Sequence, residues 1–328
     1  MNVLVVGYGS IGKRHIKNLS KFPNMNILVC TNRKYDSFLK NKKCKIFNSL
    51  DDCIKEKPDI AFITNTTNLH VKTAIKLVNA NIHIFIEKPL SNSTKDIKLL
   101  LDIVKKRKII TMMGCVLRFN PGIKKIKKII SENKIGNVIS VHAENGSFLP
   151  DWHSYEDYKK SYASRNDLGG GVVLTNIHEL DYLYWIFGNI QEVFSITGKF
   201  SELKIDVEDL SSILLHFRSN VVAEIHLDYF QKPSVRSCKV VGTHGTIYWD
   251  SNKNSILLYD VNKKKWVEKM TLKNYDINEM YLDEIKHFLR CVKKNEKSIN
   301  PIEEGVKILN VAIGIKKSSK LKKMVMIN

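Results

Sequence analysis

The first residues that could carry chemistry are glycines near the amino terminus. Gly7, Gly9 and Gly12 have the spacing G-x-G-x-x-G and follow the apolar run at 3–6. Between a strand and a helix, such glycines permit a tight turn, close backbone approach to a pyrophosphate and close helix–strand packing. The free N–H groups and partial positive charge at a helix start also favour phosphate. We predict a dinucleotide-binding loop that contains Gly7, Gly9, Ser10, Ile11 and Gly12.

The end of the second expected strand indicates which dinucleotide is bound. NAD-specific folds place an acidic residue about 20 residues after the glycines, where it binds the ribose 2′-hydroxyl. Here the strand ends at Thr31, Asn32 and Arg33, and none of these is acidic. An arginine with small polar neighbours suits a 2′-phosphate. We predict a preference for NADP(H), with NAD(H) as the other possibility; the alternative for Arg33 is a solvated turn.

A second reactive set follows the strand expected at 82–86. Glu87, Lys88 and Pro89 lie at the carboxyl end of a parallel strand, which is where open α/β sheets bind ligands. A lysine beside a nicotinamide can stabilise negative charge on a reacting oxygen, and desolvation can lower its pKa toward a useful range. We expect Pro89 to form a cis peptide that directs Lys88 into the cleft. The alternative is a solvated lysine.

A third set lies near the middle of the chain, where three glycines at 169–171 precede Thr175 and His178. Glycines let the backbone pass close to a substrate at the start of a helix. Histidine exchanges a proton near neutral pH, as a general acid–base catalyst must. A helix over 172–187 would put Thr175 and His178 on one face. The alternative for His178 is a buried structural histidine, and Asp181 either orients it or pairs elsewhere.

The elements expected around the first two sets define the fold class of the first 120 residues. Short apolar runs alternate with helical segments, a pattern typical of a doubly wound parallel sheet covered on both faces. Strands are expected at 3–6, 26–31, 45–47, 59–64, 82–86 and 109–114, and helices at 11–19, 51–57, 67–78 and 93–106.

The remainder of the chain has consecutive strands with short connections, which favours an α+β domain with a predominantly antiparallel open sheet and helices on one face. Strands are expected at 138–144, 193–197, 211–217, 221–229, 237–241, 245–249 and 255–259, and helices at 122–132, 172–187, 279–293 and 303–316. We therefore predict an α/β protein with a Rossmann domain at 1–120 and a second domain at 121–328.

Composition limits the other functions. The chain is 43% hydrophobic and 26% charged, which is typical of globular proteins, and its apolar runs are far shorter than a membrane span of about 20 residues. We expect no signal peptide. Six scattered cysteines without C-x-x-C spacing predict free thiols in a reducing cytoplasm and no metal site. The net charge of +20 is spread along the chain without stacking aromatics, so we expect attraction of anionic ligands rather than nucleic-acid binding.

Taken together, these segments resemble the glucose–fructose oxidoreductase/inositol dehydrogenase group, often called Gfo/Idh/MocA. The resemblance covers essentially the whole chain and rests on the glycine loop, 65–70, 87–89 and 169–178. It implies oxidoreduction of a sugar, cyclitol or sugar derivative with a nicotinamide cofactor. It also implies that the second domain binds substrate and that subunits form a homodimer or homotetramer.

The resemblance assigns roles to individual residues. Lys88 would be the catalytic lysine, and Glu87 would face the cofactor or orient Lys88. Asn65 would contact the cofactor, whereas His70 would do the same or be structural. Arg118 would bind a substrate anion or brace the fold. Thr175 stands where most members of the group have an aspartate; it can hydrogen-bond a substrate hydroxyl but cannot accept a proton as a carboxylate does.

The segment at 149–165 is rich in aromatic and charged residues, which suits sugar binding, and it resembles a subgroup of bacterial surface-sugar biosynthesis that includes acidic nonulosonates. The alternative is an arm that packs on a partner subunit. The substrate-binding candidates are Arg118, Trp152, His153, Tyr158, Arg165, Thr175 and His178.

We therefore predict an oxidoreductase that transfers hydride between nicotinamide and a hydroxyl or carbonyl carbon of a sugar-like substrate. Lys88 and His178 are the predicted catalytic residues, and the high positive charge points to an anionic, nucleotide-linked or phosphorylated substrate. Two alternatives stay open. One is a non-catalytic protein that senses NAD(P), and the other is an oxidoreductase for a substrate that is not a sugar.

Overall fold

The structure is a computed structural model that describes residues 1–33, 36–152 and 156–327. The chain divides into two compact units. The first contains Met1–Cys115 and Asn278–Leu309, and the second contains Val116–Ile277 and Asn310–Asn328. The structure thus groups 278–309 with the first unit, whereas the sequence division placed everything after residue 120 in the second domain.

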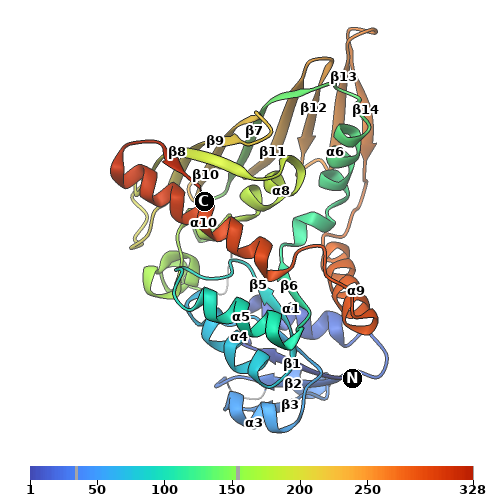
Figure 1. The fold of residues 1–328 in the computed structure, drawn as a ribbon, viewed down its shortest axis with the longest axis vertical. Coiled ribbons are helices and arrows are strands. Elements are labelled where there is room, and N and C mark those ends of the chain that lie inside the picture. The colour runs from blue at the N-terminus through green and yellow to red at the C-terminus, as the bar shows by residue number, and fades with distance from the viewer. Residues whose placement is uncertain (34–35, 153–155, 328) are drawn as a thin grey trace. The chain divides into compact units, whose positions relative to one another are not determined.

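The first unit is built on a six-stranded parallel sheet with the order β3-β2-β1-β4-β5-β6 (Figure 1). The order reverses between β1 and β4, and such a reversal is where doubly wound sheets bind ligands. The strands are β1 (Asn2–Val6), β2 (Asn26–Cys30), β3 (Lys45–Phe47), β4 (Ile60–Ile63), β5 (His83–Glu87) and β6 (Thr111–Gly114). The helices between them are α1 (Ser10–Leu19), α2 (Ser37–Asn41), α3 (Leu50–Lys55), α4 (His70–Asn79) and α5 (Ile97–Arg107). The predicted Rossmann fold is confirmed.

A segment distant in sequence covers the β6 edge of this sheet. Helix α9 (Asn278–Lys294) places the Phe288 ring centroid 5.7 Å from that of Phe62. After the helix, the Asn300 carbonyl accepts from the Met113 N–H at 2.7 Å, and the Ser298 hydroxyl donates to the Thr111 carbonyl at 2.7 Å. These bonds satisfy backbone groups that an edge strand would otherwise expose. They explain why 278–309 belongs to the first unit.

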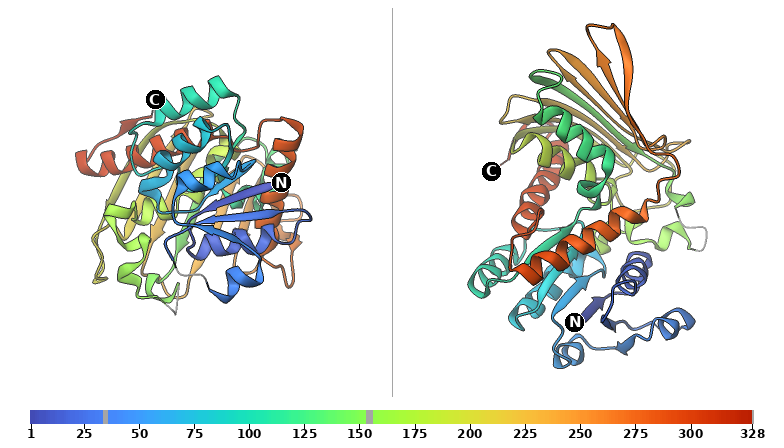
Figure 2. Two further views of the ribbon diagram at one scale, coloured as in Figure 1. Left: turned by 90° about the horizontal axis from the view of Figure 1, so that it is seen from below. Right: turned by 90° about the vertical axis from the view of Figure 1, so that its right-hand side faces the viewer.

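The second unit is built on a nine-stranded sheet with the order β14-β13-β12-β11-β7-β10-β9-β8-β15. Strands β7 and β10 are parallel neighbours, and the other described pairs are antiparallel, which confirms a predominantly antiparallel sheet. Helices α6 and α8 lie against one face (Figure 2). The strands are β7 (Val138–Gly146), β8 (Ile190–Gly198), β9 (Leu210–Phe217), β10 (Val222–Asp228), β11 (Val235–Gly242), β12 (Gly245–Asp250), β13 (Ser255–Asp260), β14 (Lys265–Thr271) and β15 (Val325–Met326). The helices are α6 (Pro121–Ser131), α7 (Val172–Thr175), α8 (His178–Phe187) and α10 (Ile302–Leu321), which begins in the first unit.

The elements differ from the sequence prediction in a few places. The single helix predicted at 172–187 is wrong, because α7 ends at Thr175 and α8 begins at His178. Strand β14 was not predicted; it is an edge strand whose residues are mostly exposed, so its sequence shows no apolar alternation. Strand β15 has only two residues, and helix α2 only five. These elements lack the length or the pattern that sequence reasoning needs.

Candidate active site

The glycine loop connects β1 to α1, and its three glycines differ in what surrounds them. Gly7 has φ of +106°, and a Cβ there would lie 2.6 Å from the backbone nitrogen of Asn65. A Cβ at Gly12 would lie 2.3 Å from the Gly7 carbonyl oxygen, whereas a Cβ at Gly9 would meet no atom within 4 Å. Packing therefore requires Gly7 and Gly12 to be glycine. Gly9 instead leaves open space at the start of α1, where Ser10 and Ile11 form the first turn.

Residues after β4 hold this loop in place. The Thr64 hydroxyl lies 3.0 Å from the carbonyl oxygens of both Val6 and Gly7. The Asn65 side chain donates to the Thr73 hydroxyl at 2.9 Å, while its Oδ1 is buried without a hydrogen-bond partner among the described residues. A buried acceptor without a donor is unusual in a folded protein. The orphan oxygen of Asn65 and the open space at Gly9 both fit a bound dinucleotide.

The end of β2 carries the residues predicted to choose the cofactor. The Thr31 hydroxyl accepts from the Arg33 backbone N–H at 3.1 Å, and the side chains of Asn32 and Arg33 are exposed. The next acidic residue along the chain is Asp36. Its carboxylate accepts from the backbone N–H of Leu39 and from the Tyr8 hydroxyl at 2.8 Å, and these two bonds lower the pKa of Asp36. The carboxylate is thus bonded to the glycine loop. Sequence reasoning missed Asp36, although it precedes α2 as a helix cap would.

The segment after β5 holds Lys88 through its neighbours. The Lys88–Pro89 peptide is cis, as predicted. Glu87 is buried, with 7% of the residue exposed. One carboxylate oxygen lies 2.6 Å from His15 Nε2, and the other accepts from the Lys88 N–H at 3.3 Å. His15 is itself fully buried. These contacts support an orienting role for Glu87. Sequence reasoning missed His15, because no spacing in the sequence connects α1 to the end of β5.

His70 ties two turns of the same unit together. Its Nδ1 lies 2.8 Å from the Pro89 carbonyl oxygen and its Nε2 lies 3.0 Å from the Asn65 carbonyl oxygen. Burial lowers the pKa of His70, and the two carbonyls act in the opposite direction. Both ring nitrogens face backbone carbonyls. The contacts therefore favour a structural role for His70 over the other predicted role, contact with the cofactor.

In the second unit, the last of the three glycines at 169–171 lies against a carboxylate. Gly171 has φ of +102°, and a Cβ there would lie 2.3 Å from Glu208 Oε1. Thr175 is the last residue of α7 and is buried beside Tyr229. Burial raises the pKa of Tyr229, and a hydrogen bond with Thr175 acts in the opposite direction. His178 is half-buried as the first residue of α8. The prediction that Thr175 and His178 share one helix face is therefore wrong, because they belong to separate helices.

The two acidic residues that follow His178 are both buried and paired. Asp181 accepts from Arg118 Nη2 at 2.8 Å and from Nε at 3.0 Å, and both side chains are about 1% exposed. Glu179 accepts from Arg236 Nε at 2.7 Å. A buried bidentate pair of this kind favours the bracing role for Arg118. It also favours the pairing role for Asp181 over the orientation of His178. Sequence reasoning missed Arg236, which lies on β11 far along the chain.

The remaining substrate candidates are engaged within the second unit. Trp152 Nε1 donates to the Ser147 hydroxyl at 2.9 Å, and the Tyr158 hydroxyl accepts from the Lys204 N–H at 3.3 Å. Arg165 forms an exposed ion pair with Asp167 at 2.6 Å. His153 lies outside the described residues. Arg165 therefore presents an exposed charge, whereas the described polar atoms of Trp152 and Tyr158 bond to neighbouring groups.

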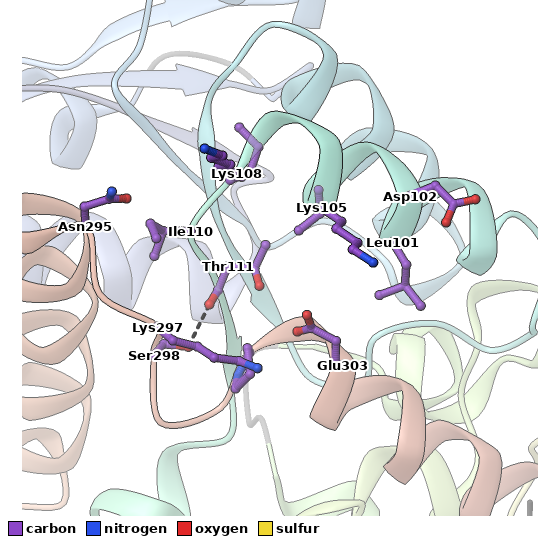
Figure 3. A pocket seen from close by; sticks show the side chains of 13 residues that line it. Leu101, Asp102, Lys105, Lys108, Ile110, Thr111, Asn295, Lys297, Ser298 and Glu303 are labelled. Atoms are coloured by element: carbon purple, nitrogen blue, oxygen red, sulfur yellow. Dashed lines mark hydrogen bonds between the residues drawn. The ribbon is translucent and has the colours of Figure 1, made fainter.

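Residues 1–33, 36–152 and 156–327 contain no group of three or more His, Cys, Asp or Glu side chains that could bind a metal. Within the same ranges, no helix combines the length and the apolar character of a membrane span. A pocket of about 410 Å³ lies in the first unit between α5 and the segment after α9 (Figure 3). Its lining includes Lys105, Lys297 and Glu303 but none of the predicted site residues. Positive and negative side chains are mixed there, so it shows no preference for one kind of charge.

A parallel sheet with a glycine loop at its reversal point, and a lysine after a neighbouring strand, define a nucleotide-binding oxidoreductase fold. Residues 1–115 match the family described as "Oxidoreductase family, NAD-binding Rossmann fold", and 123–248 match the "GFO/IDH/MocA C-terminal domain". The chain belongs to the Gfo/Idh/MocA oxidoreductase family, as the sequence analysis predicted.

Individual relatives are distant. The chain is 25% identical to a myo-inositol 2-dehydrogenase of Thermotoga maritima, with 99% of this chain and 98% of the relative aligned. It is 26% identical to a 2,7-anhydro-N-acetylneuraminate hydratase of Escherichia coli, with 60% and 52% aligned. Among solved structures, a levoglucosan dehydrogenase complex with NADH has a TM-score of 0.90 at 16% identity, covering 100% of this chain and 99% of the other. At that identity, the last match shows the fold alone.

Proposed function

We propose that this protein is an NAD(P)-dependent oxidoreductase that transfers hydride between nicotinamide and a hydroxyl or carbonyl carbon of a sugar-like substrate. The observation that carries the proposal is the buried frame around Lys88, in which Glu87 bonds to His15 and to the Lys88 N–H beside a glycine loop with open space at Gly9. Relatives named inositol dehydrogenase support the substrate class.

The proposed residues divide the chemistry between a positive charge and a proton. The Lys88 ammonium stabilises negative charge on the reacting oxygen, and the His178 imidazole donates or accepts a proton. When bound, the cofactor supplies the hydride chemistry at nicotinamide C4. The Gly7–Gly12 loop, Thr31 and Asn65 would hold its nucleotide part, and the Thr175 hydroxyl would bond a substrate hydroxyl. In this proposal the second unit binds the substrate.

Cofactor choice is the second part of the proposal, with NADP(H) preferred over NAD(H). The exposed Arg33 side chain supports it, and the Asp36 carboxylate already accepts from the Tyr8 hydroxyl. A fluorescence titration with NADPH and NADH tests this choice in the wild type and in Arg33→Ser. We expect the preference for NADPH to fall by about tenfold in Arg33→Ser, because one charge-assisted contact is lost. An unchanged preference would contradict the assignment of Arg33.

A substrate panel tests the oxidoreductase proposal itself. Turnover of cyclitols, free sugars and sugar nucleotides is measured with both cofactors for the wild type, Lys88→Met and a control, Lys72→Met, in which an exposed lysine of α4 is replaced. We expect Lys88→Met to lose about 10³-fold or more in kcat while cofactor affinity changes little. Full activity in Lys88→Met would overturn the role of Lys88. Cofactor binding without turnover of any substrate would favour the sensing alternative.

We also propose that subunits associate through the open face of the nine-stranded sheet. Exposed apolar side chains lie on this face in three neighbouring strands, namely Ile196, Leu214 and Val222. An exposed apolar patch of this kind is typical of protein interfaces. Light scattering tests the proposal, with Leu214→Glu expected to shift a dimer or tetramer toward smaller species. A monomeric wild type would contradict it.

A further inference from the structure

The second unit contains a strongly cationic hollow of about 510 Å³. Two segments, at 159–165 and 199–206, form its walls. The charged residues that line it are Lys159, Lys160, Arg165, Lys199, Lys204 and Asp206. Five of these six are positive, and they come from parts of the chain about forty residues apart. Such convergence differs from the even spread of basic residues along the sequence.

The hollow is held in shape by hydrogen bonds between its two walls. The Tyr158 hydroxyl accepts from the Lys204 N–H at 3.3 Å, and Asp206 Oδ1 accepts from the Asn166 N–H at 2.9 Å. The Asp206 N–H in turn donates to the Ser164 carbonyl. The one acidic side chain of the lining is thus bonded to backbone. Its carboxylate supports the wall and offsets one of the five positive charges.

Most of the positive charge has no carboxylate partner. Within the ranges that the structure describes, Lys159, Lys160, Lys199 and Lys204 form no ion pair, and Arg165 is paired with Asp167. The Lys199 ammonium donates to the Ser201 carbonyl at 3.0 Å, and the Lys159 ammonium lies 6.0 Å from the centroid of the Tyr158 ring. Several like charges around one hollow repel each other and create a field that concentrates anions. A carboxylate would neutralise one of them, whereas a diphosphate offers two or more charges and several acceptor oxygens to lysines and to a guanidinium.

One wall of the hollow also holds the segment that leads to the proposed active-site residues. The Gly170 N–H donates to the Arg165 carbonyl at 2.9 Å, and the Gly171 N–H donates to the Ala163 carbonyl at 3.0 Å. Helix α7, which ends at Thr175, begins at Val172. A ligand in the hollow therefore lies beside the backbone that carries the substrate residues of this unit.

We propose that this hollow binds the diphosphate of the substrate, so that the substrate class is a sugar linked to a nucleoside diphosphate. This inference rests on the proposed function, because it names the class of substrate for that reaction. The sugar would face Thr175 and His178 while its diphosphate contacts the lysines of the two walls.

Calorimetry on the full-length protein saturated with nicotinamide cofactor tests the inference, because saturation blocks the dinucleotide site. The titrants are inorganic pyrophosphate, UDP-glucose and glucose. The variant is Lys160→Gln/Lys204→Gln, and the matched control is Lys269→Gln/Lys273→Gln, which removes the same charge from exposed lysines outside the hollow.

We expect both phosphate titrants to bind the wild type, and glucose to bind much more weakly. The hollow variant should lose about tenfold or more in affinity, the control should stay within about twofold, and salt should weaken binding. Equal losses in both variants, absence of pyrophosphate and UDP-glucose binding, or glucose binding as tight as that of UDP-glucose would overturn the inference. If the variant loses phosphate binding but no sugar nucleotide is turned over, the hollow stands and the proposed function fails. If neutral sugars are turned over rapidly and neither pyrophosphate nor UDP-glucose binds, the proposed function stands and the inference about the hollow fails.

Discussion

The two units hold their predicted site residues in different ways. In the first unit, Lys88 and Asn65 lie on turns that are fixed by buried partners, namely His15 through Glu87, and His70. In the second unit, the side chains of predicted substrate residues bond to neighbouring residues, as the Arg118 side chain does to Asp181. The difference shows that a motif acting through backbone geometry carries over from sequence to structure. A role assigned by side-chain type depends on partners that the sequence does not reveal.

The largest expected effect on stability separates two ion pairs of the second unit. Asp181→Asn removes the partner of a fully buried arginine, so we expect a loss of about 3–5 kcal/mol in the free energy of unfolding. The matched change Asp167→Asn breaks the exposed pair with Arg165, which water and salt screen, and should cost far less. Urea denaturation measures both. Similar losses would contradict the distinction between a bracing Arg118 and an open Arg165.

A smaller effect separates two glycines of the first unit. In Gly12→Ala the new methyl would meet the Gly7 carbonyl oxygen at 2.3 Å, and we expect a net loss of about 1–3 kcal/mol despite the better helix propensity of alanine. Gly9→Ala meets no atom within 4 Å and should change stability by less than about 1 kcal/mol. Thermal unfolding of both variants measures the difference in stability between them. A Gly12→Ala variant as stable as Gly9→Ala would contradict the prediction.

The smallest expected effects are pH dependences of opposite sign in the two units. Burial lowers the pKa of His70, so the unfolded chain binds the proton first, and stability is lost as pH falls below about 6.5. The Glu192 carboxylate raises the pKa of His216, so its contribution is present below about pH 6.5 and is lost as pH rises through the raised pKa.

Unfolding free energies from about pH 5 to about pH 8 measure these slopes. His70→Gln should reduce the loss of stability on the acid side, and His216→Gln should increase it. Slopes that change in the same direction for both variants would rule out this assignment of charge states.

Much of the fold followed from sequence because the parallel strands are continuous apolar runs and the glycine loop has a fixed spacing. The site was predictable where backbone geometry matters, as at Gly7, Gly12 and the cis Lys88–Pro89 peptide. His15 and Arg236 were not predictable, since their partners come from elements distant in sequence. The same holds for the cationic hollow, whose walls meet only in the folded second unit.

The most direct test of the oxidoreductase assignment is a fluorescence titration of wild type and Gly9→Val with NADPH and NADH, accompanied by thermal unfolding. Gly9 borders open space in the protein alone, so valine should leave the unfolding temperature within a few degrees. A bound pyrophosphate needs that space, so we predict that the wild type binds a reduced cofactor and that affinity falls by about 100-fold or more in the variant. Equal affinities in the two proteins, or a wild type that binds neither reduced nor oxidised cofactor, would contradict a dinucleotide site at this loop.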